Sequence, residues 1–210
     1  DMTDEQVPKI LKGGEFLIKE SDPQSIFIPE DFNEEQLLIR STVRSFVENE
    51  IWKKGSKLEN QVNLLREAAS LGLLGAHVSE EYGGMPMDTH SNTIISEELG
   101  RGDASFNTSI AAHTGIGMLP IYYFGSEHLK KKYLALLCSG EIKASYCLTE
   151  PESGSDALNA KTTAVFDKER NEFILTGQKM WISNAGFADI FIVFAQVDGD
   201  RFTCFVVDRN

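Results

Sequence analysis

The sequence predicts an α+β fold, in which an all-helical N-terminal part is followed by an incomplete antiparallel β-barrel-like part. Up to Gly140, apolar residues recur at helical spacing between capping residues and glycines. From Ile142 on, short apolar segments are separated by turn-forming residues, which is the pattern of strands. We therefore divide the chain into an N-terminal arm (residues 1–32), a helical domain (33–140) and a β domain (141–210).

The arm is polar and irregular, and we expect it to pack either on the body of the protein or on another subunit. The helices that follow each have a start or stop signal. Glu97 and Glu98 end one of them, where a solvated or salt-bridged helix end is a better interpretation than a catalytic carboxylate pair. We predict helices over 33–51 (cap Asn33), 57–71 (ending at Gly72), from Asp88 to Gly100, within the small-residue stretch 103–124, and from Ser126 to Gly140.

Strands are predicted at 142–149, 160–167, 171–179, 189–197 and 201–208. Turn residues at 168–171 and 198–200 separate two pairs of them. Segment 189–197 is apolar on both faces, so we expect it at the centre of the sheet. The sequence ends two residues after the last segment, and we expect a β domain that lacks its closing strands.

Composition excludes several classes of function. The formal net charge of −12 disfavours a nucleic-acid partner, because phosphate binding needs clustered lysines and arginines. The longest apolar runs fall well short of the ~18 residues that a transmembrane helix needs. The 3 cysteines are odd in number and widely spaced, which favours reduced thiols in a reducing compartment. The 4 histidines lack metal-ligand spacing, and we predict no metal site.

Two short clusters carry the chemistry. The first, the hydroxyl loop (149–156), follows a strand and contains Ser153, Gly154 and Ser155, whose hydroxyls and N–H groups can face phosphate oxygens. Glycine there opens backbone angles closed to other residues and lets a ligand approach the main chain. The second, the tryptophan segment (179–184), places Trp181 two residues before a serine hydroxyl. Together they suit a flat heteroaromatic cofactor with a pyrophosphate tail, although a core tryptophan and ordinary turn residues explain each cluster taken singly.

These clusters, T-E-P-x-S-G-S-D and K-M-W-I-S-N, resemble the acyl-CoA dehydrogenases, flavoenzymes of fatty-acid β-oxidation. The resemblance extends over L-G-L-L-G at 71–75, E-Y-G-G at 81–84, E-E-L-G at 97–100 and the segment 125–134, in family order from about residue 34 to the end. It implies FAD as cofactor. Family roles fall on matching positions: Tyr146, Leu148 and Thr149 at the isoalloxazine edge, Ser155 at the pyrophosphate, Trp181 on the ring, and Ser183 toward flavin N5. Gly154 and Ile182, within the same two clusters, are further candidate cofactor-binding residues.

The resemblance also implies a substrate, for which Ser155 and Ala112 are the matching residues. Ala112 stands where medium-chain relatives have a glutamate that closes the acyl pocket, so the chain is similar to the very-long-chain branch. The family's catalytic glutamate lies in a C-terminal four-helix domain, and no residue of this chain matches its motif. We therefore expect no catalytic base here, no turnover by these 210 residues alone, and weak FAD binding.

As partners, the resemblance implies an acyl-CoA, an electron-transfer flavoprotein and a homo-oligomer of the full-length enzyme. It places the protein in the cytoplasm of a bacterium or the mitochondrial matrix of a eukaryote. Three alternatives stay open: an acyl-CoA oxidase or flavin monooxygenase of the same fold, a non-catalytic assembly or binding module, and an α+β domain without cofactor.

Overall fold

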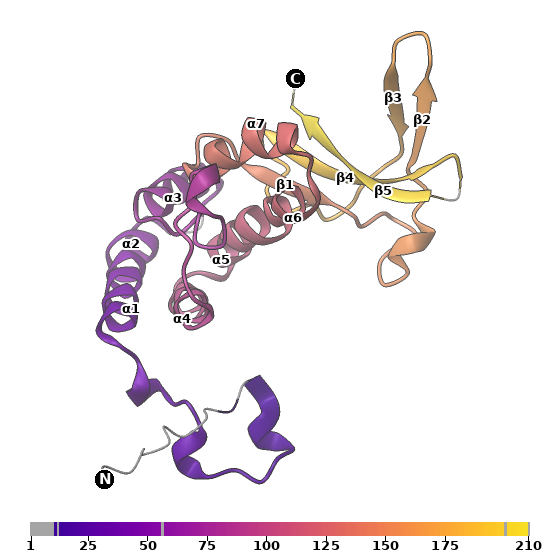
Figure 1. Ribbon diagram of the computed structural model, residues 1–210. Coiled ribbons are helices and arrows are strands. Elements are labelled where there is room, and N and C mark those ends of the chain that lie inside the picture. Colours follow the sequence, from indigo (N-terminus) through magenta and orange to yellow (C-terminus); the bar gives the residue numbers. More distant parts are fainter. Residues whose placement is uncertain (1–10, 12, 56, 200, 210) are drawn as a thin grey trace.

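The computed structural model describes residues 11, 13–55, 57–199 and 201–209 (Figure 1). A helical part and a β-sheet lie next to each other, and the described residues before α1 (11 and 13–33) form an arm that extends from the helical part (Figure 1). Phe27 in this arm stacks on His90 with ring centroids 4.2 Å apart, so the arm contacts the body. Residues 1–10 and 12 of the predicted arm and Asp200 of the last predicted turn lie outside the described residues.

The predicted helices are confirmed, and their caps form as expected. Asn33 Oδ1 accepts a hydrogen bond from Gln36 N (2.8 Å), Asp88 Oδ1 accepts from Ser91 N (2.9 Å), and Gly140 ends the last helix with φ +67°. Two π-helical stretches, Val47–Ile51 and Ala112–Gly117, interrupt the helices. The helices are α1 Glu34–Phe46, α2 Trp52–Lys54, α3 Leu58–Ser70, α4 Thr89–Gly100, α5 Ala104–Ala111, α6 Leu119–Phe124 and α7 Glu127–Cys138.

A buried carboxylate joins α1 to α4 inside the helical part. The side chain of Glu98 is fully buried, and it accepts hydrogen bonds from Arg40, Arg44 and Arg101 at 2.6–3.2 Å. The hydrogen bond from Arg44, helped by those from Arg101 and Arg40, lowers the pKa of Glu98 to about 2. The salt-bridged helix end that the sequence favours is thus confirmed, and Glu98 is a structural residue.

Strand β4 lies at the centre of the sheet, as predicted. Because β5 pairs with β4 along its whole length, β1 and β2 share the other edge of β4, at Ile190–Val193 and at Gln196–Val197. The strands are β1 Ala144–Cys147, β2 Thr163–Asp167, β3 Glu172–Thr176, β4 Ile190–Val197 and β5 Arg201–Asp208.

The predicted antiparallel sheet is wrong in one respect, because the sheet is mixed. The short turns give the antiparallel pairs β2–β3 and β4–β5, whereas β1 and β2 both run parallel to β4. The connection over residues 148–162 is long enough to bring the chain from β1 into β2 in the same direction, whereas the connection over 177–189 reverses the chain between β3 and β4. The sheet is open among the described residues, and the β2–β3 hairpin projects from it (Figure 1).

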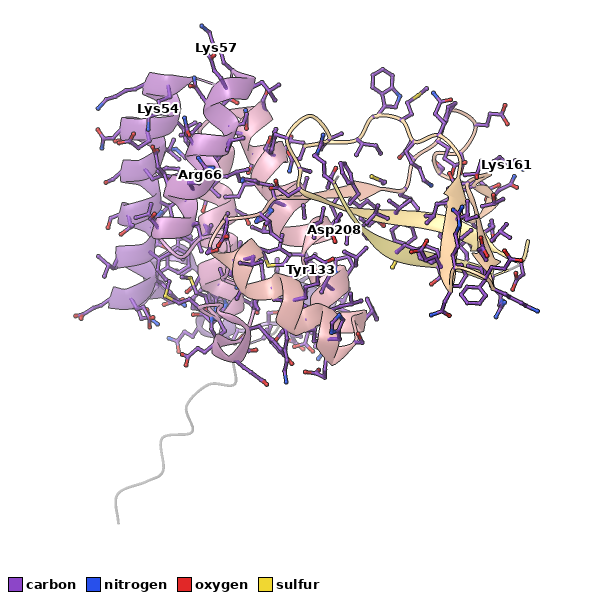
Figure 2. All side chains as sticks on the ribbon, turned by 90° about the horizontal axis from the view of Figure 1, so that it is seen from above. Lys54, Lys57, Arg66, Tyr133, Lys161 and Asp208 are labelled. Carbon is purple, nitrogen blue, oxygen red and sulfur yellow. The ribbon has the colours of Figure 1, made fainter. Side chains whose placement is uncertain are left out.

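The last helix holds the end of the sheet against the helical part. The Tyr133 hydroxyl of α7 donates to Asp208 Oδ1 of β5 (2.9 Å), and Lys132 Nζ donates to the other oxygen (3.0 Å). Figure 2 shows Tyr133 and Asp208 meeting where the helices adjoin the sheet. No helix of the described residues has both the length and the apolar character needed to cross a membrane.

Candidate cofactor site

The hydroxyl loop and the tryptophan segment meet in the structure, although residues 157–178 separate them in the chain. Met180 N donates to the carbonyl of Thr149 (2.9 Å), and Lys179 Nζ donates to the carbonyl of Leu148 (3.1 Å). The hydroxyl loop connects β1 to β2, which share one edge of β4, and the tryptophan segment lies on the connection from β3 into β4, so the sheet brings both segments to the same strand.

Glu150 anchors the junction between the two clusters. Its buried carboxylate accepts hydrogen bonds from Lys179 Nζ (2.8 Å), Thr162 N (3.0 Å) and Lys161 N. Burial by itself raises the pKa of Glu150, but the hydrogen bonds from Lys179 and from the main-chain amides of Lys161 and Thr162 outweigh it and lower the pKa to about 2. An ionised carboxylate with this many donors holds the loop in place and is a poor proton acceptor for catalysis.

Trp181 is held in place but uncovered. Its side chain is 86% exposed, and its φ of +58° lies in the left-handed region that residues other than glycine seldom occupy. An indole normally buries a large apolar area, so an exposed indole on a hydrogen-bonded segment leaves an aromatic face free for a planar partner. The structure therefore rules out the interpretation of Trp181 as a core tryptophan.

The neighbours of Trp181 lie closer to the body. Ile182 and Ser183 are half-buried, and the Ser183 carbonyl accepts a hydrogen bond from the Ser145 hydroxyl of β1 (2.6 Å). Tyr146, also on β1, packs edge-on against Phe194 at 5.0 Å between ring centroids. Leu148 and Thr149 are half-buried where β1 enters the hydroxyl loop. The structure thus brings Tyr146, Leu148, Thr149, Trp181, Ile182 and Ser183 to one region.

Within the hydroxyl loop, Ser153 and Ser155 differ. Ser153 is buried, and its hydroxyl donates to the Asp156 carbonyl (2.7 Å), so it is committed to the loop itself. Ser155 is exposed. Gly154 does not need the backbone freedom expected of it, since its φ is not positive, but a Cβ there would meet no atom within 4 Å. The main chain at Gly154 is therefore open to approach.

Ala112 is the first residue of the π-helical stretch Ala112–Gly117, which contacts β1. It is 4% exposed, one helical turn after Ser109, whose carbonyl accepts a hydrogen bond from Asn184 Nδ2 (2.9 Å). Gly117 packs against β1, where an added Cβ would lie 2.6 Å from Ala144 Cβ. A cavity of about 200 Å³ between α4 and α5 is lined by Ala111, Thr114 and Gly115 rather than by Ala112.

Sequence reasoning missed the residues that hold this region together: Glu150, Lys179, Asn184, Ser145 and His113. The first two carried a usable signal, because a carboxylate and an ammonium group beside strand segments need a partner once they are buried. The other three bond to main-chain carbonyls or N–H groups, and such partners leave no trace in the sequence.

Comparisons with known proteins agree with this geometry. The family model described as "Acyl-CoA dehydrogenase, N-terminal domain" matches residues 33–141, and "Acyl-CoA dehydrogenase, middle domain" matches residues 145–210. A probable acyl-CoA dehydrogenase of Bacillus subtilis is 48% identical over 206 residues, which are 96% of this chain and 34% of that protein.

Two solved structures extend the likeness to three dimensions. The crystal structure of an acyl-CoA dehydrogenase complexed with FAD from Bacillus anthracis has a TM-score of 0.87 and 47% identity, covering 94% of this chain and 35% of that one. A glutaryl-CoA dehydrogenase from Mycobacterium smegmatis has a TM-score of 0.79 and 33% identity, covering 86% and 47%. The chain thus spans about a third to a half of these proteins.

Proposed function

The chain belongs to the acyl-CoA dehydrogenase family, and on this premise we propose that it forms the FAD-facing half of an enzyme that desaturates an acyl-CoA thioester in fatty-acid β-oxidation. The observation that carries the proposal is the direct hydrogen bond between Met180 N and the Thr149 carbonyl, at 2.9 Å. It joins the segment with the exposed indole to the loop with the exposed serine. These are the two surfaces that a ring and a pyrophosphate need.

The residues present fit FAD. Trp181 offers an uncovered aromatic face, and the main chain at Gly154 is open to a phosphate. Thr149 and Ser183 would orient the ring through their hydroxyls and backbone, and Ser155 would hold the pyrophosphate near the substrate. FAD, when bound, supplies the acceptor for the hydride that leaves the β carbon of the thioester.

The base that removes the α proton is proposed to lie outside these residues. Glu150 is ionised, buried and bonded to Lys179 and two main-chain amides, so it is unsuited to that role. We propose that these 210 residues alone bind FAD weakly and do not oxidise an acyl-CoA. Bleaching of flavin absorbance when a long-chain acyl-CoA is added to this chain would contradict that.

A titration with FAD tests the cofactor assignment. The sequence contains 2 tryptophans, so Trp52→Phe leaves Trp181 as the reporter, and Trp181→Leu is the matched variant with Trp52 as reporter. We expect FAD to quench Trp181 emission in the first variant through stacking, and to bind Trp181→Leu about tenfold more weakly, as measured by ultrafiltration. Equal affinity for both variants, or no quenching of Trp181 by bound FAD, would contradict the assignment.

We propose a preference for long acyl chains, because residue 112 is an alanine. In the full-length enzyme, Ala112→Glu should shift the chain-length optimum toward shorter substrates by filling space with a carboxylate. The measurement is kcat/KM against acyl length, with Ala111→Glu as the control that faces the α4–α5 cavity. A wild-type optimum at short chains would contradict the proposal.

For the full-length enzyme we propose an electron-transfer flavoprotein as acceptor, a homo-oligomeric state and, in a bacterium, a cytoplasmic location. Reoxidation of the reduced enzyme in air tests the first of these. Slow reoxidation that an electron-transfer flavoprotein accelerates supports a dehydrogenase, and fast reoxidation by oxygen alone supports an oxidase.

A further inference from the structure

The helical part and the β part are joined at Ala144, the first residue of β1. Its N–H donates to His113 Nδ1 (3.1 Å), and its carbonyl accepts from Asn184 Nδ2 (3.3 Å). The Cβ of Ala144 packs so closely against Gly117 that a Cβ at residue 117 would not fit. His113 of the helical part and Asn184 of the tryptophan segment thus bond the N–H and the carbonyl of the same residue, Ala144.

Asn184 reaches across this junction to the helical wall. The same Nδ2 that bonds Ala144 also donates to the Ser109 carbonyl of α5 (2.9 Å), and the residue is only 7% exposed. Both neighbours are carbonyl oxygens, which only accept, so the amide nitrogen must face them. Asn184 has φ +65°, which asparagine tolerates better than most residues, so the segment turns sharply at the point where its amide is fixed.

Asn184 is therefore the place where the position of Trp181 and Ser183 is set relative to α5. Ser183 is additionally bonded through its carbonyl to Ser145, and Phe187 N and Ala188 N both donate to the Asn184 carbonyl. If the amide of Asn184 no longer bonds Ser109, the turn retains the bond between Ser183 and Ser145 of β1 and the packing of Phe187 on the helical core, but it loses its hydrogen bond to α5. The indole would then be free to move relative to the helical wall.

We propose that Asn184 is a positioning residue, which aligns the ring-binding segment with α5, the helix that carries Ser109 and leads directly into Ala112. The proposal rests on the proposed function for its catalytic meaning. It adds a separate claim, that the position of the tryptophan segment relative to α5 depends on the side-chain amide of Asn184.

The test compares Asn184→Asp with Asn92→Asp. Aspartate keeps the shape and tolerates the left-handed backbone, but it replaces the donor by an oxygen facing two carbonyls. Asn92 is the matched control, because its Nδ2 also bonds main-chain carbonyls, those of Ala76, Met87 and Asp88, within the helical part. Both variants are made in the Trp52→Phe background, so that emission reports Trp181 alone.

The first measurement needs no cofactor. We expect Asn184→Asp to shift the Trp181 emission maximum and to speed amide hydrogen exchange at residues 181–188, while Asn92→Asp, at matched loss of stability, leaves both unchanged. If both variants change these readouts equally, Asn184 is merely structural and the proposal is overturned.

The second measurement is FAD affinity by Trp181 quenching. We expect the dissociation constant of Asn184→Asp to rise about tenfold, as for the loss of one buried hydrogen bond, and that of Asn92→Asp to stay near the parent value. If the parent binds FAD and Asn184→Asp binds it with the same affinity, the proposal is overturned. Failure of the parent to bind FAD counts against the proposed function instead, and emission and exchange then decide the positioning claim alone.

Discussion

Acidification should weaken the junction between the two parts through His113. The ring is fully buried; its Nδ1 accepts from Ala144 N, so it is Nε2–H that donates to the Leu137 carbonyl (3.0 Å), and the imidazole is neutral. Burial, helped by the charge of Lys143, lowers the pKa of His113 to about 4, although the bond to Leu137 and the charge of Asp189 oppose the shift. Protonation of His113 at Nδ1 would break the hydrogen bond that this nitrogen accepts from Ala144 N.

The sign and size of the effect follow from linkage. The unfolded chain binds this proton with a pKa of 6.5 and the folded chain with a pKa of about 4, so lowering the pH favours unfolding within that interval. The contribution of His113 is complete above pH 6.5 and is lost as the pH falls toward 4. The loss is about 1.4 kcal/mol for each pH unit inside the interval, or about 3 kcal/mol in total.

The assay is urea denaturation followed by circular dichroism at steps between pH 7.5 and 4. His113→Gln is the control, since glutamine keeps a donor for the Leu137 carbonyl but does not titrate. It should be less stable at pH 7 and should have a flatter pH profile above pH 4.5, the region where few carboxylates titrate. Parallel profiles for the wild type and His113→Gln would refute the reasoning.

Three further changes have expected outcomes at pH 7. Glu98→Gln removes the charge that three arginines share and should lower the free energy of unfolding by about 3 kcal/mol in urea titrations. Gly177→Ala should destabilise by about 2 kcal/mol in the same assay, because its Cβ would lie 2.7 Å from Thr162 Cα. Lys179→Met should destabilise by about 3 kcal/mol and weaken FAD binding, because it leaves Glu150 buried without its cation.

Each of these changes has a control in the chain. Glu97→Gln alters the exposed neighbour of Glu98, and Gly154→Ala places a Cβ where no atom lies within 4 Å. Lys161→Met removes the ammonium group of an exposed residue that bonds Glu150 through its main-chain N–H. Neither Gly177 nor Gly154 has a positive φ, so the two alanine variants differ in the clash and not in left-handed backbone strain. Equal losses in a variant and its control would contradict the contact assigned to that residue.

Local chemistry in the sequence was enough to place most elements. Asn33, Asp88 and Ser126 cap helices because a side-chain oxygen near an unpaired N–H acts within a few residues, and such signals are visible in the chain itself. The apolar run at 189–197 identified the central strand, which pairs on both edges and has side chains that are buried or half-buried throughout.

The sequence by itself determined the order of helices and strands, the family, and the two clusters from which a cofactor site is built. The tertiary structure alone decided that the sheet is mixed, that Trp181 is uncovered, and that Glu150, Asn184 and His113 hold the site together. The direction of a strand depends on the path that the long connection before it takes through space. The side chains of Glu150, Asn184 and His113 bond main-chain groups, which every residue carries. Spatial proximity, which no local pattern encodes, selects those partners.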